Sequence, residues 1–282
     1  MIFNHYLITR FNLKNPSWKF TKNNELLLND QWMDERIDLF ANFCLPSVAA
    51  QTNKNFKWLL YFDNDTAPKH KEQIATLIKP YLFIEVFYIE GMPALVDSIR
   101  KYIANNSKSE YLITSRIDND DSISKNFIDV VQSKFDKQNH LAIDVILGYT
   151  LSVTPYMIGK KEHLFNPFMS LIETAENAKT VWFYDHNMWK KEKNIIHFSD
   201  ERLWLSIIHE KNKVNEFDGY GNVNWEKVSQ NFIVSPKKND EITANIIPQS
   251  KWLYLSIKNQ LYVNFGFYLK FVKKKLGLYK IK

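Results

Sequence analysis

The amino-acid sequence predicts an α/β protein built on a mostly parallel sheet flanked by helices. Two observations carry this prediction. Apolar runs typical of buried strands alternate with helical patterns through residue 150, and acidic clusters at 63–65 and 118–121 directly follow two of those runs. Such alternation is typical of doubly wound sheets with right-handed crossovers. Ligands of these sheets bind beyond the carboxyl ends of the strands, so we expect both clusters to reach one crevice.

The first half of the chain is expected to supply most of the sheet. The nearly continuous apolar run at 56–62 is typical of a strand that is buried on both faces. Apolar residues at helical spacing predict helices that begin near Asp30, near Thr66 and at Pro93. The other strands of this half are expected at 6–11, 82–89 and 111–117.

The second half predicts fewer regular elements. Ser124 is expected to cap a helix that reaches Phe135, and strands are expected at 142–149 and 180–184. Residues 200–209 are predicted to form a helix, because three apolar side chains recur on one side of it. Those side chains are Leu203, Ile207 and Ile208.

An excess of basic residues is confined to the end of the chain. The formal net charge is +6, and residues 251–282 hold eight lysines and no acidic residue, which leaves −2 for the rest. A protein whose main partner is nucleic acid normally carries a basic face on its folded body. We therefore expect no nucleic-acid partner, and divide the chain into a globular domain at 1–248 and a basic aromatic tail at 249–282.

Composition also limits the cellular location. The chain has 282 residues, of which 45% are hydrophobic, and a single cysteine, Cys44, which rules out an internal disulfide. A reducing compartment is favoured. The first residues lack the features of a signal peptide, and no run approaches 18 apolar residues, so no spanning helix is expected. These features together predict a cytoplasmic protein.

The sharpest chemical signal is Asp118-Asn119-Asp120-Asp121, directly after the strand expected at 111–117. Two carboxylates two residues apart at the end of a buried strand can point together into a cleft. Oxygen ligands of this kind suit Mg²⁺ or Mn²⁺, and such a metal can stabilise a diphosphate as a leaving group. The alternative is a turn closed by aspartate side chains. The glycine and distant glutamate of a calcium-binding EF-hand loop are missing.

Several long and unusual stretches of the chain carry a family resemblance. They are ITRF at 8–11, WMDERIDLF at 32–40, CLPSVAAQT at 44–52, FKWLLYFD at 56–63, TSRIDNDDSIS at 114–124, LGYT at 147–150, NPFMSLIE at 166–173 and LWLSIIHEKN at 203–212. From about residue 6 to about residue 215 the chain resembles the rhamnosyltransferase family of bacterial glycosyltransferases. The resemblance implies a GT-A-like fold, of the Rossmann type, and transfer of a sugar from a nucleotide-diphosphate donor with a divalent metal.

The resemblance implies roles for individual residues around the acidic cluster. Asp118 would hold the donor ribose or the metal, Asp120 would be the direct metal ligand, and Asp121 would orient them or bind acceptor. Arginines in matching segments are candidates for the donor diphosphate, because a guanidinium offers a fork of donors suited to phosphate. They are Arg10, Arg36 and Arg116.

The first two strands contribute further candidates. Asp63 ends the second matching strand, where related folds bind the base or ribose of the nucleotide, and Thr9 is a candidate for the same role. His209 is a candidate third metal ligand, because a late histidine often completes the metal site in enzymes of this fold and imidazole accepts Mn²⁺. His186 is a weaker candidate for that position.

An inverting transfer needs a general base for the proton of the acceptor hydroxyl. Asp200 and Glu201 are the candidates, because they would open the helix expected at 200–209 and lie at its N-terminus; Glu173 stands behind them. The alternative is that these acidic residues only cap a helix and complement its dipole. Trp182 and Trp204 could stack on a sugar, although core packing is the commoner role of such rings.

The tail interleaves aromatic residues with lysines, which is typical of an amphipathic segment at a membrane surface. The alternative is a C-terminal helix docked on the domain with its lysines in water. We therefore expect an enzyme that transfers a sugar to a surface polysaccharide or lipid-linked glycan, at the inner face of the cell membrane. The competing hypotheses are a metal-dependent nucleotidyl- or phosphotransferase, and a non-catalytic membrane- or nucleic-acid-binding module. The phosphate-binding pattern GxxxxGK[ST] is missing from the sequence.

Overall fold

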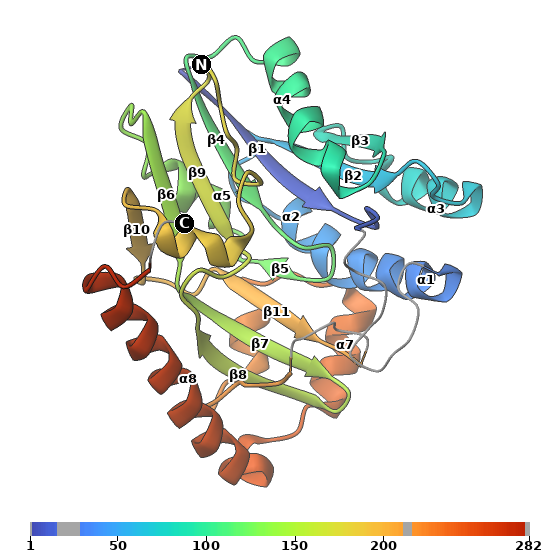
Figure 1. Ribbon diagram of the computed structural model, residues 1–282. Helices are drawn as coiled ribbons and strands as arrows, with labels where there is room; N and C mark the ends of the chain where they lie inside the picture. The colour runs from blue at the N-terminus through green and yellow to red at the C-terminus, as the bar shows by residue number, and fades with distance from the viewer. Residues whose placement is uncertain (1, 16–28, 211–215, 280–282) are drawn as a thin grey trace.

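Two β-sheets form the scaffold of the protein (Figure 1). The computed structural model describes residues 2–15, 29–210 and 216–279. Within them, the larger sheet has seven strands in the order β10-β6-β9-β4-β1-β2-β3, and the smaller has four in the order β5-β11-β7-β8.

The larger sheet is mostly parallel, as predicted. β1 lies between β2 and β4 and runs parallel to both, and β2 is parallel to β3. β9 is inserted antiparallel between β4 and β6. The strands of this sheet are β1 Phe3–Arg10, β2 Lys57–Asp63, β3 Ile84–Ile89, β4 Tyr111–Arg116, β6 His140–Val145, β9 Met169–Thr174 and β10 Ile195–Phe198.

Helices cover both faces of the larger sheet. Apolar residues of α1, α2, α3 and α5 pack on one face, and those of α4 pack on the other. Asn29, one residue before the expected cap, accepts a hydrogen bond from the backbone N–H of Trp32 and begins α1. The elements are α1 Asp30–Leu39, the π-helix η1 Phe40–Cys44, α2 Leu45–Ala49, α3 Pro68–Ile78, the 3₁₀ turn η2 Met92–Ala94, α4 Leu95–Asn106 and α5 Phe127–Gln132.

The smaller sheet has its own apolar core, which it shares with two C-terminal helices. Its strands are β5 Ser122–Ile123, β7 Leu147–Val153, β8 Tyr156–Glu162 and β11 Trp204–Ile208, and the helices are α6 Trp225–Ser229 and α7 Pro236–Asn245. β11 runs parallel to β7 and antiparallel to β5. Because β5 begins at Ser122, the smaller sheet begins immediately after the acidic cluster.

Four sequence predictions about the second half of the chain are wrong. Ser124 does not cap a helix that reaches Phe135, because α5 begins after Asn126 and ends at Gln132. The helix expected at 200–209 is strand β11, because all five of its residues are buried between β5 and β7, and pairing on both edges overrides the helical spacing. The strand expected at 180–184 is irregular. The strand expected at 142–149 is two strands of different sheets, since the chain passes from β6 to β7 at Ile146.

The C-terminal tail forms a long helix, α8 Leu253–Lys275, after the 3₁₀ turn η4 Gln249–Trp252; another 3₁₀ turn, η3 His186–Lys191, precedes β10. Figure 1 shows α8 along the outer edge of the molecule, beside β8 and β10. No helix within the described ranges is both long and apolar enough to cross a membrane.

Candidate active site

The acidic cluster and Asp63 lie at the carboxyl ends of β4 and β2, the two strands that flank β1. The segment after β1 is bonded to both. Asn119 Nδ2 donates to the carbonyl oxygen of Phe11 at 3.3 Å, and the backbone N–H of Lys14 donates to Asp63 Oδ2 at 3.0 Å. The two predicted polar ends are therefore joined through one loop at the same edge of the sheet.

Asp120 is the best-connected carboxylate of the cluster. Its Oδ2 lies 2.5 Å from Nη1 of Arg36 and 3.1 Å from Nε2 of His209. Burial raises the pKa of Asp120, but the charge of Arg36 and the hydrogen bond from His209 outweigh it and hold the pKa below its usual range. Helix α1, the end of β4 and the end of β11 thus meet at one oxygen, and His209 is brought to the cluster as predicted.

Asp121 and Asp118 have different surroundings. Asp121 is buried, and its Oδ1 accepts a hydrogen bond from the backbone N–H of Ile207 at 2.9 Å. Burial, followed by the charges of Asp120 and Asp118, raises its pKa well above the usual value. The Asp118 side chain is 30% exposed, and its Oδ1 is buried without a hydrogen-bond partner, 4.0 Å from Nη2 of Arg116. Asp118 is therefore the carboxylate with unused bonding capacity.

These residues fit a divalent metal as part of a site. Within the residues that the structure describes, no three His, Cys, Asp or Glu side chains are grouped as metal ligands, so Asp118, Asp120 and His209 do not form a complete ligand set. A cation would, however, satisfy the buried Oδ1 of Asp118. Mg²⁺ is commonly held by one or two carboxylates together with substrate phosphates. The donor set thus suits a metal that a diphosphate helps to hold.

Two arginines share one tryptophan ring beside the cluster. The guanidinium carbon of Arg116 lies 3.9 Å from the ring centroid of Trp182, and that of Arg10 lies 5.2 Å from it. Arg116 is 1% exposed, yet its Nε and Nη1 have no hydrogen-bond partner. Burial lowers the pKa of Arg116 to about 10, so it stays charged at neutral pH. Unsatisfied buried donors on a cation suit an anionic ligand.

Asp185 and His186, at the start of the 3₁₀ turn η3, lie within electrostatic range of Arg116. Burial, together with the charges of Arg116 and Arg10, lowers the pKa of His186 to about 4, against the opposing charges of Asp118 and Asp185. Asp185 is exposed, and its side chain makes no capping bond to η3. Sequence reasoning missed Asp185; its only signal is its place before His186, in a segment without regular pattern.

Thr9 and Asp63 make contacts within the fold. Thr9 is fully buried, and its hydroxyl oxygen accepts a hydrogen bond from Nε1 of Trp58 at 3.0 Å. Asp63 is 5% exposed, and its two carboxylate oxygens accept backbone hydrogen bonds from Lys14 and Asp65. Asp63 therefore closes the turns at the sheet edge, while Thr9 is buried within β1.

Asp200 and Glu201 are not brought to the cluster. They precede β11, whose other end leads to His209, and five extended residues span about 17 Å. Both are exposed, and Glu201 accepts a hydrogen bond from Asn126 Nδ2 at 2.7 Å. Glu201 lines a separate cavity of about 450 Å³. The reason for choosing these residues, a helix N-terminus in the cleft, is therefore wrong, because the segment forms a strand.

The remaining sequence candidates have structural surroundings. Glu173 is 4% exposed and accepts backbone hydrogen bonds from Lys179 and Thr180. Trp204 is 1% exposed, stacks on Phe168 with ring centroids 5.1 Å apart, and does not face a cleft. Trp182 is also packed in the core, although one of its faces carries Arg116.

A family model described as "Putative rhamnosyl transferase" matches residues 4–219. Among solved structures, the chain is similar to S. aureus TarS 1-349 in complex with UDP, at 13% identity and a TM-score of 0.42, over 74% of this chain and 61% of that chain. It is also similar to GalNAc-T7 with UDP, GalNAc and Mn²⁺, at 12% identity and a TM-score of 0.38, over 80% of this chain and 47% of that chain. No curated protein has a significantly similar sequence.

Proposed function

Since the chain belongs to the rhamnosyl transferase family, whose model covers residues 4–219, we propose that it transfers a sugar from a nucleotide-diphosphate donor to a hydroxyl of a surface polysaccharide or lipid-linked glycan. The sugar is rhamnose or another hexose. The observation that carries the proposal is the proximity of the Asp118 carboxylate to the buried, unsatisfied guanidinium of Arg116 at the end of β4.

The arginines supply the positive charge that a diphosphate requires. Arg116 offers Nε and Nη1 from a buried position, and Trp182 holds its guanidinium plane. Arg10 approaches the same ring from the end of β1. Both therefore favour the leaving diphosphate, because its negative charge increases as the bond to the sugar breaks.

Asp118, Asp120 and His209 would hold Mn²⁺ or Mg²⁺, which would add a Lewis acid beside the diphosphate. Arg36 holds the Asp120 carboxylate in its ionised form and fixes its direction. Asp121, bonded to the backbone of Ile207, fixes the turn that presents Asp118 and Asp120.

The general base is proposed to be Asp185 rather than Asp200 or Glu201. In an inverting transfer the acceptor oxygen attacks the anomeric carbon, the bond from that carbon to the diphosphate oxygen breaks, and the base takes the hydroxyl proton. The base must lie beside the reacting carbon. Asp185 is exposed and close enough to Arg116 and His186 to influence their pKa values.

We propose a catalytic domain at 1–248 and a basic aromatic tail at 249–282. A cytoplasmic location, at the inner face of the cell membrane, agrees with the single buried Cys44 and the basic tail.

The proposal is tested by the thermal stability of the full chain with UDP, dTDP or GDP, each with and without Mn²⁺. A ligand that binds only the folded state raises the melting temperature by mass action. We expect a metal-dependent rise with one nucleotide, which Asp118→Asn abolishes and Asp136→Asn, in an exposed turn, preserves. Selection of dTDP would favour rhamnose as the sugar, and selection of UDP a hexose or galactofuranose.

Two results would contradict the proposal. If no nucleotide at saturating concentration shifts the melting temperature of the parent, the acidic cluster does not bind a nucleotide-diphosphate donor. If the shift survives in Asp118→Asn, the donor binds elsewhere. Retention of the parent melting temperature by Asp118→Asn without ligand shows that the variant is folded.

A further inference from the structure

Helix α8 is oriented with its polar side toward the protein. A helix turns once every 3.6 residues, so side chains three and four apart share a face. The inner stripe of α8, which faces the body, includes four polar or charged side chains. The residues of this stripe are Ser256, Asn259, Val263, Phe267, Lys270 and Lys274. A surface helix normally turns its apolar side inward, so the orientation of α8 is reversed.

Specific hydrogen bonds hold this orientation near the start of the helix. Ser256 Oγ accepts from the backbone N–H of Gly221 at 2.8 Å. Asn259 Nδ2 donates to the carbonyl oxygen of Gly219 at 3.0 Å and to that of Phe217 at 3.3 Å. These are side-chain bonds to fixed backbone groups, so they determine which side of α8 faces the body.

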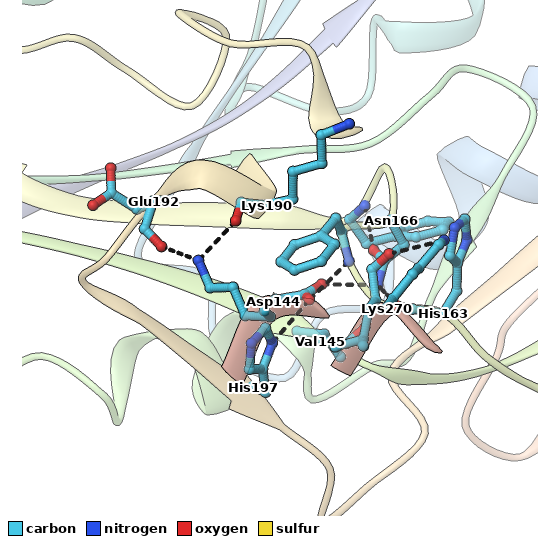
Figure 2. Close-up of polar contacts among 12 residues, drawn as sticks. Asp144, Val145, His163, Asn166, Lys190, Glu192, His197 and Lys270 are labelled. Atoms are coloured by element: carbon cyan, nitrogen blue, oxygen red, sulfur yellow. Dashed lines mark hydrogen bonds and ion pairs between the residues drawn. The ribbon is translucent and has the colours of Figure 1, made fainter. Parts of the chain in front are cut away.

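Two lysines extend the attachment toward the other end of α8. Lys270 Nζ donates to the carbonyl oxygen of Leu164 at 3.5 Å, and Lys274 Nζ donates to that of Lys190 at 2.8 Å. Figure 2 shows Lys270 beside the polar network around Asp144, which includes His197 and Asn166. The lysines of the inner stripe are half-buried and donate to backbone carbonyls of the body.

The opposite side of α8 is an exposed apolar face. Its residues repeat every three or four positions, from Tyr254, which is 84% exposed, to Leu276, the C-cap residue, which is 65% exposed. We call this set the outer face: Tyr254, Ile257, Leu261, Phe265, Tyr268, Val272 and Leu276. A continuous apolar stripe of this length is uncommon on a monomer and indicates a surface with a partner.

The charges around the outer face select the kind of partner. Lys258, Lys273 and Lys275 are exposed on α8, and residues 251–282 contain no acidic residue. A second copy of the chain packed on this face would bring like charges together without acidic partners from the helix. A lipid surface with anionic headgroups offers both an apolar layer and negative charge.

We propose that the outer face of α8 binds the surface of an anionic lipid bilayer, with the helix lying in the plane of the interface. The helix is about 35 Å long, at 1.5 Å per residue, and its aromatic rings enter the boundary between headgroups and acyl chains. The exposed lysines contact the headgroups, and the inner stripe keeps the catalytic domain attached. This inference concerns a surface separate from the acidic cluster and does not depend on the transferase reaction.

The test is flotation of the full chain with vesicles of phosphatidylcholine alone or mixed with phosphatidylglycerol. We expect the parent to float with the mixed vesicles, and Leu261→Ser/Phe265→Ser/Tyr268→Ser to bind them at least tenfold more weakly. Leu82→Ser is the matched control, because Leu82 is 92% exposed and lies before β3, away from α8. Lys258→Gln/Lys273→Gln/Lys275→Gln should weaken binding about fivefold per lysine. All the substituted side chains are exposed, so the melting temperatures should stay unchanged.

Four results would overturn the proposal in whole or in its anionic character. The first is equal flotation of the parent and the outer-face variant with mixed vesicles. The second is absence of flotation for the parent. The third, measured by light scattering without vesicles, is a dimer of the parent that the outer-face variant converts to a monomer, which would assign the face to a second copy of the chain. Equal binding to neutral and anionic vesicles would overturn the role of the lysines.

Discussion

Nη1 of Arg36 lies 2.5 Å from Oδ2 of Asp120, and both side chains are largely buried. Arg36 belongs to α1 and Asp120 follows β4, so the ion pair joins a helix on the sheet to the strand end that carries the acidic cluster. The guanidinium carbon of Arg36 also lies 5.1 Å from the ring centroid of Trp32. The pair therefore holds Asp120 in place while the neighbouring Asp118 stays accessible.

Loss of Arg36 is expected to destabilise the protein strongly. Arg36→Met keeps the apolar stem and removes the cation from the buried Asp120 carboxylate, which retains its hydrogen bond with His209; this should lower the free energy of unfolding by about 3 kcal/mol. Urea denaturation at pH 7 measures it. Lys57→Met is the matched control, because the Lys57–Glu85 pair is exposed and should contribute less than about 1 kcal/mol. Equal losses in the two variants would contradict the importance of the buried pair.

Trp182 is expected to affect nucleotide binding through Arg116. Trp182→Leu removes the aromatic face, and a cation–π contact of about 1 kcal/mol corresponds to about fivefold weaker binding of the nucleotide diphosphate. Titration calorimetry, below the melting temperature of the variant, measures the dissociation constant. Trp182→Phe should bind nearly as well as the parent. Phe183→Leu, whose ring contacts Arg100, should leave the dissociation constant unchanged.

The base assignment distinguishes Asp185, which precedes η3, from Asp200 and Glu201, which precede β11. Asp185→Asn should lower kcat about 100-fold or more while the KM for the donor changes little, because proton transfer contributes that range. Glu201→Gln and Asp200→Asn should stay within about twofold of the parent. Steady-state transfer assays with the nucleotide sugar identified by thermal stability measure these values. The opposite pattern would return the role to the residues before β11.

Because His5 is buried, the protein is expected to lose stability at acidic pH. It lies in the core beside Ser115, and burial lowers its pKa to about 3. The unfolded chain, with a histidine pKa near 6.5, binds the proton first, so the stabilising effect of neutral His5 is full above pH 6.5 and is lost as the pH falls toward 3. Between pH 7.5 and 5, the parent should lose about 2 kcal/mol more than His5→Gln, by urea denaturation at each pH. Parallel losses would show that His5 is protonated in the fold.

Gly148 and Gly266 are expected to respond oppositely to alanine. A Cβ at Gly148 would lie 2.0 Å from the ring of Trp204, which is itself fixed by its stack on Phe168, so Gly148→Ala should lower the melting temperature markedly. At Gly266, within α8, a Cβ meets nothing within 4 Å, and alanine should stabilise the helix by about 1 kcal/mol. Thermal unfolding measures both. A neutral effect at Gly148 would contradict the close contact between Gly148 of β7 and the Trp204 ring of β11.

Much of the larger sheet could be predicted from the sequence, because local patterns are strong there. The apolar run at 56–62 corresponds to β2 at 57–63, between β1 and β3, and the helices expected near Asp30 and Thr66 begin at Asp30 and Pro68. The acidic cluster follows the buried strand β4, as predicted. Its position beyond the carboxyl end of a parallel strand is where ligands of such sheets bind.

The second half could not be predicted in the same way. Residues 200–209 carry a helical spacing of apolar side chains, but β5 and β7 provide partners on both edges of residues 204–208, and that distant pairing decides for a strand. The same change moves Asp200 and Glu201 away from the cluster and brings His209 to Asp120. Asp185 could not be found because an irregular segment gives no periodic signal.

The sequence by itself determined the α/β class, the acidic cluster at a strand end and the basic aromatic character of the tail, because these depend on local patterning and composition. Only the tertiary structure decided which residues share a site and which side of α8 faces outward. Both depend on contacts between residues far apart in the chain, such as Arg36 with Asp120 and Asn259 with Gly219. Local patterning contains no information about such pairs, because they come together only when the chain folds.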